Sequence, residues 1–351
     1  MKNKRILLIG PFPPPIGGVS VSSQRLYEHL IIEGYIVDKY DVRFPFKKPY
    51  NNKILRILRI AIFPFYLIAN KRYDVIHFNI SGTLIRLYIS FWRTFFSKKT
   101  KFISTIHGDV SNLLISRFGK SCLSGFDLVI CVKEGDKAIL QKHFKKPVAE
   151  IPAFIPPVIA DDYEKLIPDE VNKFITKDNL PIIIWNGLIL TDGKYFDLYG
   201  LKIMVTVFID LINSGVEAKL LLLLLGEITG IKQKSCLEEI NSLIDNNNLS
   251  DLILVYRVTN SDLWPILKKS SVFVRPTLTD GDALSVREAL YFNIPVVASD
   301  VAQRPLGTIV YNVRDDNDLL IKLREVLVKK DKSIGIKNNY AYKIIEQYEA
   351  N

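Results

Sequence analysis

Two acidic residues near the end of the chain are spaced to hold one extended polar ligand. They enclose the stretch Asp280-Gly281-Asp282-Ala283-Leu284-Ser285-Val-Arg-Glu288, which predicts a glycine loop that leaves a strand and enters a helix. Asp280 is expected in the loop, and Glu288 about one turn or more inside the helix. The first backbone N–H groups of a helix lack partners within the helix and favour anions. The stretch therefore predicts a cradle in which a diphosphate lies on free N–H groups between two carboxylates.

A second candidate ligand site is the glycine loop near the start of the chain. The sequence Gly10-Pro-Phe-Pro-Pro-Pro-Ile-Gly17-Gly18-Val-Ser20 follows an apolar run and precedes a helical pattern. The two adjacent glycines let the backbone turn tightly and approach a ligand, and the next helix offers N–H groups to a phosphate or to sugar hydroxyls. The spacing is not the G-x-G-x-x-G of dinucleotide-binding folds. A proline-rich turn that ends in a helix cap at Ser20 explains the same residues equally well.

Polar residues also follow two of the expected strands of the first half. His107 comes directly after the apolar run 101–106 and before a glycine, so it is expected at the carboxyl end of a strand, where α/β folds bind ligands. His77 and Asn79 end another expected strand and are candidates for the acceptor side of the site. A purely structural role is at least equally open for His77.

The sequence predicts neither a metal site nor a disulfide framework. No cluster of His, Cys and Asp has metal-ligand spacing, and the Asp-Gly-Asp at 280–282 stands before a helix rather than between apolar strands. Cys122, Cys131 and Cys236 are far apart, odd in number and without C-x-x-C spacing. A reducing compartment fits this cysteine usage.

Strand-like apolar runs alternate with helical stretches along most of the chain, which is the pattern of a doubly wound α/β fold. The run 220–225 is continuously apolar, as in a strand buried on both faces. The expected strands are 5–9, 36–40, 75–78, 101–106, 128–132 and 149–151 in the first half, and 182–186, 219–226, 252–256, 272–275, 296–298 and 309–311 in the second. The expected helices of the first half are 20–33, 53–70, 84–96 and 135–143.

The same βα rhythm starts twice, and the proline-bearing, acidic segment 155–178 separates the two halves. We therefore expect two Rossmann-like domains, residues 1–158 and 159–335, with the carboxyl ends of both sheets around one ligand in a central cleft. Residues 336–351 form a helical pattern. This helix is expected to pack back on the first domain.

Positive charge is concentrated in the first half. Residues 1–150 contain 25 Lys and Arg against 10 Asp and Glu, whereas residues 151–351 contain 22 against 27. Segments 53–66 and 84–99 interleave basic with apolar and aromatic residues, and neither has the ~20 uninterrupted apolar residues of a membrane-spanning helix. We expect interfacial helices on an anionic membrane surface. Core helices whose Arg side chains reach solvent are the alternative, and nucleic acid is disfavoured because no recognition motif accompanies the charge.

The stretch from Asp280 to Glu288 resembles the E-x7-E signature of retaining GT-B glycosyltransferases, specifically of glycosyltransferase family 4, with Asp in place of the first Glu. The resemblance extends from the Gly17-Gly18 loop to the strand that ends at Ala298-Ser299. It implies a GT-B fold with an N-terminal acceptor domain and a C-terminal domain for the nucleotide-sugar donor. It also implies that no metal takes part.

The resemblance also implies roles for single residues. Asp280 would bind hydroxyls of the donor sugar and Glu288 the ribose, while His107 would lie close to the donor sugar. The backbone near Arg257 and Val258 would contact the base. A UDP-sugar is the donor that the frequency of donors within the family favours.

One family feature is missing from this chain. The family usually carries an Arg and a Lys after the first strand of the second domain, where they grip the diphosphate, and here Leu188 and Tyr199 occupy those positions. The charge of a diphosphate needs compensation in a metal-free site, because helix dipoles supply only partial charges. The candidate substitutes are Arg275, Arg287 and Arg304, and Arg304 is favoured because it lies in a loop after a strand.

The sequence thus predicts a retaining glycosyltransferase that moves a sugar from a nucleotide-diphosphate donor to a lipid-linked glycan acceptor. The combination of Asp197-Leu-Tyr-Gly with Asp280-Gly-Asp resembles a subgroup of bacterial polysaccharide transferases, which implies surface polysaccharide or capsule synthesis. The expected location is the cytoplasm, peripheral to the inner face of the cell membrane. Two alternatives stay open: a non-catalytic GT-B-like partner protein, which the missing basic pair favours, and a nucleotide-sugar epimerase.

Overall fold

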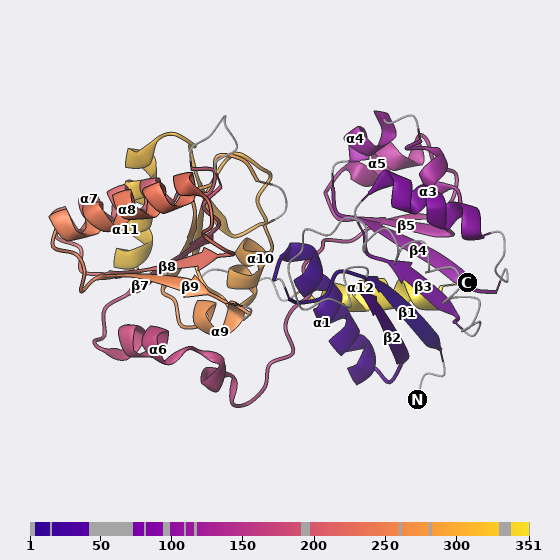
Figure 1. Ribbon diagram of the computed structural model, residues 1–351, viewed down its shortest axis with the longest axis horizontal. Helices are drawn as coiled ribbons and strands as arrows, with labels where there is room; N and C mark the ends of the chain where they lie inside the picture. Colours follow the sequence, from indigo (N-terminus) through magenta and orange to yellow (C-terminus); the bar gives the residue numbers. More distant parts are fainter. Residues whose placement is uncertain are drawn as a thin grey trace. The chain divides into compact units, whose positions relative to one another are not determined.

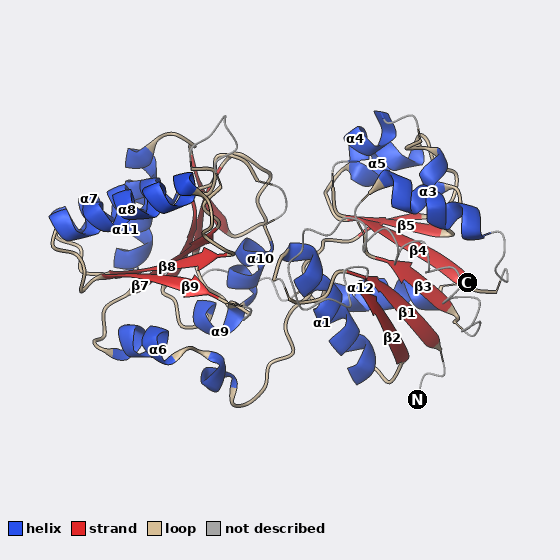
Figure 2. Cartoon of the chain, in the orientation of Figure 1, coloured by secondary structure: helices blue, strands red, loops and turns tan. Residues whose placement is uncertain are grey.

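The computed structural model divides into two compact units, each built on a six-stranded parallel sheet (Figures 1 and 2). Unit 1 comprises Met1–Val158 together with Asn339–Asn351, and unit 2 comprises Ile159–Asn338. The two sheets with their covering helices confirm the predicted α/β fold class. The structure describes residues 4–14, 16–41, 73–80, 82–93, 99–108, 110–115, 118–190, 197–259, 262–280, 283–329 and 338–350.

In unit 1 the strands follow the order β2-β1-β3-β4-β5-β6. They are β1 (Arg5–Gly10), β2 (Ile36–Asp41), β3 (Val75–Phe78), β4 (Lys101–Ile106), β5 (Leu128–Cys131) and β6 (Val148–Glu150). The helices are α1 (Gly18–Ile32), α3 (Thr83–Trp92), α4 (Val110–Ile115), the 3₁₀ helix η2 (Ser121–Leu123), α5 (Asp136–Gln141) and α12 (Tyr340–Glu349).

In unit 2 the order is β12-β11-β10-β7-β8-β9. The strands are β7 (Ile182–Gly187), β8 (Lys219–Leu225), β9 (Ile253–Val258), β10 (Val272–Arg275), β11 (Val296–Ser299) and β12 (Thr308–Tyr311). The helices are η3 (Tyr163–Leu166, 3₁₀), α6 (Asp169–Thr176), α7 (Leu201–Asn213), α8 (Ile231–Asn246), α9 (Trp264–Leu267), α10 (Leu284–Tyr291) and α11 (Asp316–Lys329).

Helices cover both faces of each sheet, so central strands such as β3, β5, β7 and β10 are buried along their whole length. The edge strands β2 and β12 are partly exposed. In unit 1, α3, α4 and α5 share one core with the sheet, and α1 and α12 contact each other on the other side (Figure 2). In unit 2, α7, α8 and α11 pack on one face and α6, α9 and α10 on the other. The expectation for 220–225 is confirmed for Leu220 to Leu224, which are at most 2% exposed, while Leu225 is half-buried.

Every strand expected from the sequence is present, with ends that differ by no more than two residues. The reason is that buried parallel strands are short apolar runs bounded by polar or glycine residues. The expected helix 53–70 lies outside the described residues. Helix α4 was not expected from the sequence. Among the residues that the structure describes, no helix combines the length and apolar character that crossing a membrane requires.

The last helix, α12, belongs to unit 1 although it comes after all of unit 2 in the sequence (Figure 1, yellow). Lys4 Nζ donates to the carbonyl of Tyr348 (2.9 Å), and Lys101 Nζ donates to the carbonyl of Gln347 (2.9 Å). Tyr35 OH donates to Glu349 Oε1 (2.6 Å). Lys4, just before β1, and Lys101, the first residue of β4, thus satisfy free carbonyls at the C-terminal end of this helix.

Both sheets reverse their direction of growth beside their first strand, between β1 and β3 in unit 1 and between β7 and β10 in unit 2. Open α/β sheets bind ligands outside the carboxyl ends of the strands at such a switch point. The residues that follow these four strands are therefore the first place to look for a functional site.

Candidate functional site

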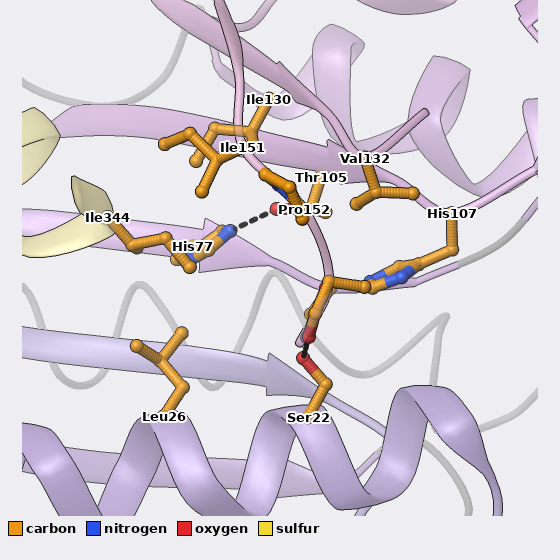
Figure 3. Close-up of a pocket in the computed structure, with 12 residues that line it drawn as sticks. Ser22, Leu26, His77, Thr105, His107, Ile130, Val132, Ile151, Pro152 and Ile344 are labelled. Carbon is orange, nitrogen blue, oxygen red and sulfur yellow. Dashed lines mark hydrogen bonds between the residues drawn. The ribbon is translucent and has the colours of Figure 1, made fainter. Parts of the chain in front are cut away.

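In unit 1, polar side chains gather at the carboxyl ends of β3 and β4. A small pocket lies there (Figure 3). Its polar lining comes from Ser22, His77, Asn79, Thr105 and His107. Its apolar lining comes from α1, α12 and the strand ends of β5 and β6. The structure thus brings together His77, Asn79 and His107, as the candidates from the sequence require.

A chain of hydrogen bonds determines which nitrogen of His107 carries the proton. Ser23 Oγ donates to the carbonyl of Val19 (2.9 Å), so it must accept from Asn79 Nδ2 (2.8 Å). The amide of Asn79 therefore presents its oxygen to Nε2 of His107, with which it is in hydrogen-bond contact. A neutral His107 is protonated on Nε2, and Nδ1 keeps its lone pair. No residue in the described part of the chain donates to that Nδ1.

Both histidines of the pocket are neutral at physiological pH. Burial, with a smaller contribution from the charge of Arg86, lowers the pKa of His107 to about 4. Burial likewise lowers the pKa of His77 to about 3, with a smaller contribution from His107. The Nδ1 of His107 can therefore accept a hydrogen bond from a hydroxyl group, whereas a cationic interaction with phosphate is disfavoured.

His77 has no free ring nitrogen. It is 1% exposed, with Nδ1 2.5 Å from the hydroxyl of Tyr348 and Nε2 2.7 Å from Thr105 Oγ1. Its ring also meets the edge of the Tyr348 ring at a centroid distance of 5.7 Å. Its polar atoms therefore hold α12 on the sheet, which is the structural role left open by the sequence. A sugar acceptor could therefore contact His77 only through the face of its imidazole ring.

The glycine loop leaves open space in front of α1. Gly17 has φ −165°, an extended conformation that any residue adopts. A Cβ atom added there would meet only Ser20 Oγ, at 3.9 Å. Neither conformation nor packing within unit 1 requires glycine at this position, so the capped turn alone does not account for it. Gly18, the first residue of α1, has its N–H free of any acceptor within the helix.

The predicted membrane segment 84–99 is described at residues 84–93 and 99. Arg86 is 4% exposed and donates to the carbonyls of Ile80 (2.7 Å) and Thr105 (3.2 Å). Arg86 is therefore not one of the side chains through which the segment could meet an anionic surface, because its guanidinium satisfies carbonyls beyond β3 and at the end of β4. Arg93 pairs with Asp127 (3.3 Å) inside unit 1. The other predicted segment, 53–66, lies outside the described residues.

In unit 2, two arginines share one carboxylate at the carboxyl ends of β10 and β11. Arg275 Nε lies 3.2 Å and Arg304 Nη1 2.8 Å from Asp280 Oδ2. The side chains are 9%, 3% and 9% exposed for Arg275, Arg304 and Asp280. Burial alone would raise the pKa of Asp280, but the charge of Arg275 and the hydrogen bonds from both arginines outweigh it and lower this pKa.

Arg304, the favoured substitute for the missing basic pair, is bound within unit 2 through all three of its nitrogens. Nε donates to the carbonyl of Ser299 (2.8 Å), and Nη2 donates to Ser299 Oγ (3.2 Å) and Thr277 Oγ1 (3.4 Å). Its third nitrogen holds Asp280. The geometry makes Arg304 a support for Asp280, and Arg275 is left as the arginine nearer to the switch point.

Helix α10 begins at Leu284, so the N–H groups of Ala283, Leu284 and Ser285 lack acceptors within the helix. Glu288 lies one turn after the first residue of α10 and is 6% exposed. The loop residues Gly281 and Asp282 lie outside the described residues. The start of α10 and the buried acid Glu288 follow each other as the sequence predicts. The ligand roles of these residues stay predictions.

Three further residues, Arg287, Arg257 and Val258, were predicted at the donor site. Arg287 lies on α10 and is half-buried. Arg257 is exposed at the end of β9, where it pairs with Glu227. The Val258 side chain is buried in the core, so only its backbone is available to a ligand.

Sequence reasoning missed Asn186. It is a polar residue at the end of an apolar strand, Ile-Ile-Ile-Trp-Asn-Gly, and that interruption is the signal that marks it. Its side chain is 4% exposed, at the switch point of unit 2. Among the described residues no group of three or more His, Cys, Asp or Glu side chains could hold a metal ion.

Comparison with known proteins gives two family matches and many similar structures. The model described as Glycosyltransferase Family 4 matches residues 16–158, and the model described as Glycosyl transferases group 1 matches residues 188–328. No curated protein sequence matches the chain.

Three solved structures illustrate the shared fold. A glycosyltransferase from Rickettsia africae aligns with a TM-score of 0.68 and 15% identity over 99% of this chain and 98% of its own. Sucrose-phosphate synthase from Thermosynechococcus elongatus gives 0.65 and 17% over 99% and 95%. HepE from Anabaena, in complex with UDP-glucose, gives 0.61 and 12% over 98% and 98%.

Proposed function

Because the chain belongs to the group 1 glycosyltransferases of the GT-B type, we propose that it transfers a sugar from a nucleotide-diphosphate donor to a glycan with retention at the anomeric carbon. Unit 2 is the donor domain in this proposal, and unit 1 is the acceptor domain. The glycan is lipid-linked and belongs to a surface polysaccharide.

One observation carries the donor part of the proposal. Arg275 at the end of β10, Asp280 in the loop that leads into α10 and Arg304 in the loop after β11 form one buried cluster. Two guanidinium groups around one carboxylate leave one net positive charge in the cluster, and a diphosphate leaving group needs such a charge. The Anabaena structure holds UDP-glucose, which supports a UDP-sugar as the first donor to test.

Transfer with retention breaks the bond between the anomeric carbon and the diphosphate oxygen and forms a bond to the acceptor hydroxyl on the same face. The protein contributes mainly by neutralising the leaving group and by orienting both substrates. On the side of unit 1, the free Nδ1 of His107 is suited to hold a sugar hydroxyl, since Asn79 directs the proton to the other nitrogen.

The proposed place of action is the cytoplasmic face of a membrane. Leu84 and Phe91 on α3 are 68% and 62% exposed, and residues 1–150 carry the excess positive charge. Apolar side chains within a cationic region suit the surface of an anionic bilayer. Replacing both with Ser should reduce sedimentation with anionic vesicles at low salt. Equal sedimentation of both proteins, or none by the original chain, would refute the membrane part.

The test of the function is a donor panel followed by product analysis. UDP-, GDP-, ADP- and TDP-sugars are compared by thermal shift, since selective binding stabilises the folded protein. The preferred donor is then incubated with lipid-linked acceptors, and NMR of the product determines the anomeric configuration. Glu288→Gln should bind the donor more weakly. An inverted product would refute retention, and a chain that binds no nucleotide sugar would be the non-catalytic partner protein instead.

A further inference from the structure

The switch point of unit 2 contains a buried acceptor atom without a donor. The side-chain oxygen Oδ1 of Asn186 has no hydrogen-bond partner in the described part of the chain, although Asn186 is 4% exposed. A buried polar atom left without a hydrogen bond costs about 1–3 kcal/mol. Such an atom at the carboxyl end of β7, where α/β sheets bind ligands, indicates a partner that arrives with a ligand.

Arg275 faces the same place from the neighbouring strand β10. Its Nη1 donates to the carbonyl of Asn186 (3.1 Å), while Nε and Nη2 donate to Asp280. A guanidinium has five N–H donors. Two of those of Arg275, one on each terminal nitrogen, have no acceptor among the residues that the structure describes. The buried arginine therefore has capacity for an anion.

The loop before α7 holds the guanidinium in place. Gly200 has φ +71°, and a Cβ atom there would lie 2.2 Å from the carbonyl oxygen of Pro276, so only glycine permits this close approach. The approach brings the ring of Tyr199 to 4.7 Å from the guanidinium carbon of Arg275. Asp280, itself bound by Arg304, accepts hydrogen bonds from Nε and Nη2 of Arg275. Arg275 is thus fixed before any ligand binds.

We propose that Arg275 and Asn186 form the diphosphate subsite of this enzyme, with Arg275 donating to phosphate oxygens and Asn186 Oδ1 accepting from a hydroxyl of the same ligand. Tyr199 and the Asp280–Arg304 pair are positioning residues that act through Arg275. The assignment rests on the proposed function, because it takes the ligand to be a nucleoside diphosphate donor. In this proposal the positive charge that binds the diphosphate is Arg275 on β10. It does not come from the positions after β7, where this chain has Leu188 and Tyr199.

The subsite is tested by calorimetric binding of three probes, namely inorganic pyrophosphate, UDP and uridine. Arg275→Gln should weaken pyrophosphate and UDP by about 10- to 100-fold, which is the loss of hydrogen bonds to a charged group, and should leave uridine unchanged. Asn186→Asp should weaken both anions as well, because the new carboxylate pairs with Arg275. The matched control is Arg324→Gln, which removes an exposed charge from α11 and should leave all three affinities unchanged.

A rescue variant separates loss of the subsite from loss of the fold. Tyr199→Lys in the Arg275→Gln background places an ammonium group next to the vacated position and should restore at least part of the pyrophosphate affinity. Thermal unfolding of each variant verifies that unit 2 is folded. A failed rescue in a folded double variant counts against the assigned position of the anion.

The possible results show separately whether the proposed subsite or the proposed function is wrong. If UDP binds but Arg275→Gln binds it equally well, the subsite is refuted and the proposed function stands. If pyrophosphate binds through Arg275 but no nucleoside diphosphate does, the subsite stands and the donor class is wrong. Absence of binding by either anion to the original chain would overturn both.

Discussion

The carboxyl ends of the two sheets carry polar networks of opposite kinds. In unit 1 the side chains of His77, Asn79, Thr105 and His107 form an uncharged network with hydroxyl and amide partners. The buried Arg86 beside it donates to carbonyls and to Ser104 Oγ rather than to a carboxylate. In unit 2 it is ionic, with two arginines around Asp280 (2.8 and 3.2 Å). The same strand-end position therefore serves two chemistries, and the side chains that end the strands decide which one. A neutral network suits hydroxyl groups, whereas an ionic one suits an anion.

The two networks also differ in the free-energy cost of removing one of their residues. Removing one charge from a buried ionic cluster leaves its partner charge desolvated, which is costly. Removing one hydrogen bond from a neutral network leaves a single unsatisfied polar atom, which costs less. The comparison can therefore be tested by removing one member from each.

The largest effect is expected for Asp280→Ala, because it leaves two buried guanidinium groups without their shared carboxylate. The free energy of unfolding of unit 2 should fall by about 3–5 kcal/mol. Urea unfolding followed by the fluorescence of Trp185 and Trp264, both buried in unit 2, measures it. The control Asp162→Ala breaks an exposed pair with Lys165 and should have no measurable effect. Similar losses in both variants would mean that the buried cluster is not special.

A smaller effect is expected for Tyr348→Phe in unit 1. The variant keeps the ring but removes the hydroxyl that lies 2.5 Å from His77 Nδ1, so a buried ring nitrogen loses its partner. The cost should be about 1–3 kcal/mol and should appear as faster hydrogen exchange in α12. Tyr342→Phe, on the exposed side of the same helix, should leave the exchange unchanged. Unchanged exchange in both variants would show that the His77 contact does not hold α12.

The sequence was most informative where local pattern alone decides the structure. The central strands were predictable because a strand covered on both faces is a continuous apolar run, such as Leu220 to Leu224. The turn into α10 was predictable because Gly281 and the following helical pattern mark a loop and a helix start. The short helix α4 has six residues, too few to show a helical period.

Charged side chains were harder to predict, because their partners come from distant parts of the chain. The sequence around Arg86 has the pattern of an amphipathic helix, which predicts that the arginine faces solvent or a membrane surface. Its actual partners are carbonyls beyond β3 and at the end of β4. Arg304 is tied to Asp280 across 24 residues, so its loop position alone made it look free. The orphan oxygen of Asn186 is a property of packing that no spacing reveals.

The last prediction, which is the smallest effect near neutral pH, concerns acid. The pKa values of His77 and His107 are lowered by burial to about 3 and about 4, so the unfolded chain binds protons first as the pH falls below about 6.5. Their contribution to the stability of unit 1 is complete above that pH and is lost as the pH falls toward the folded-state values. Between pH 7 and 6 the loss should be about 0.7 kcal/mol for each histidine.

Below pH 6 the same loss steepens to at most about 1.4 kcal/mol per pH unit for each histidine. The ionic cluster of unit 2 behaves differently, because the lowered pKa of Asp280 keeps it charged to below the ordinary value of 3.8. Hydrogen exchange of the two sheets at pH 7, 6 and 5, corrected for intrinsic rates, should therefore show unit 1 weakening first. His77→Gln should reduce the pH dependence of unit 1 alone. Parallel weakening of both sheets would mean that the neutral and ionic networks do not set the acid response of their units.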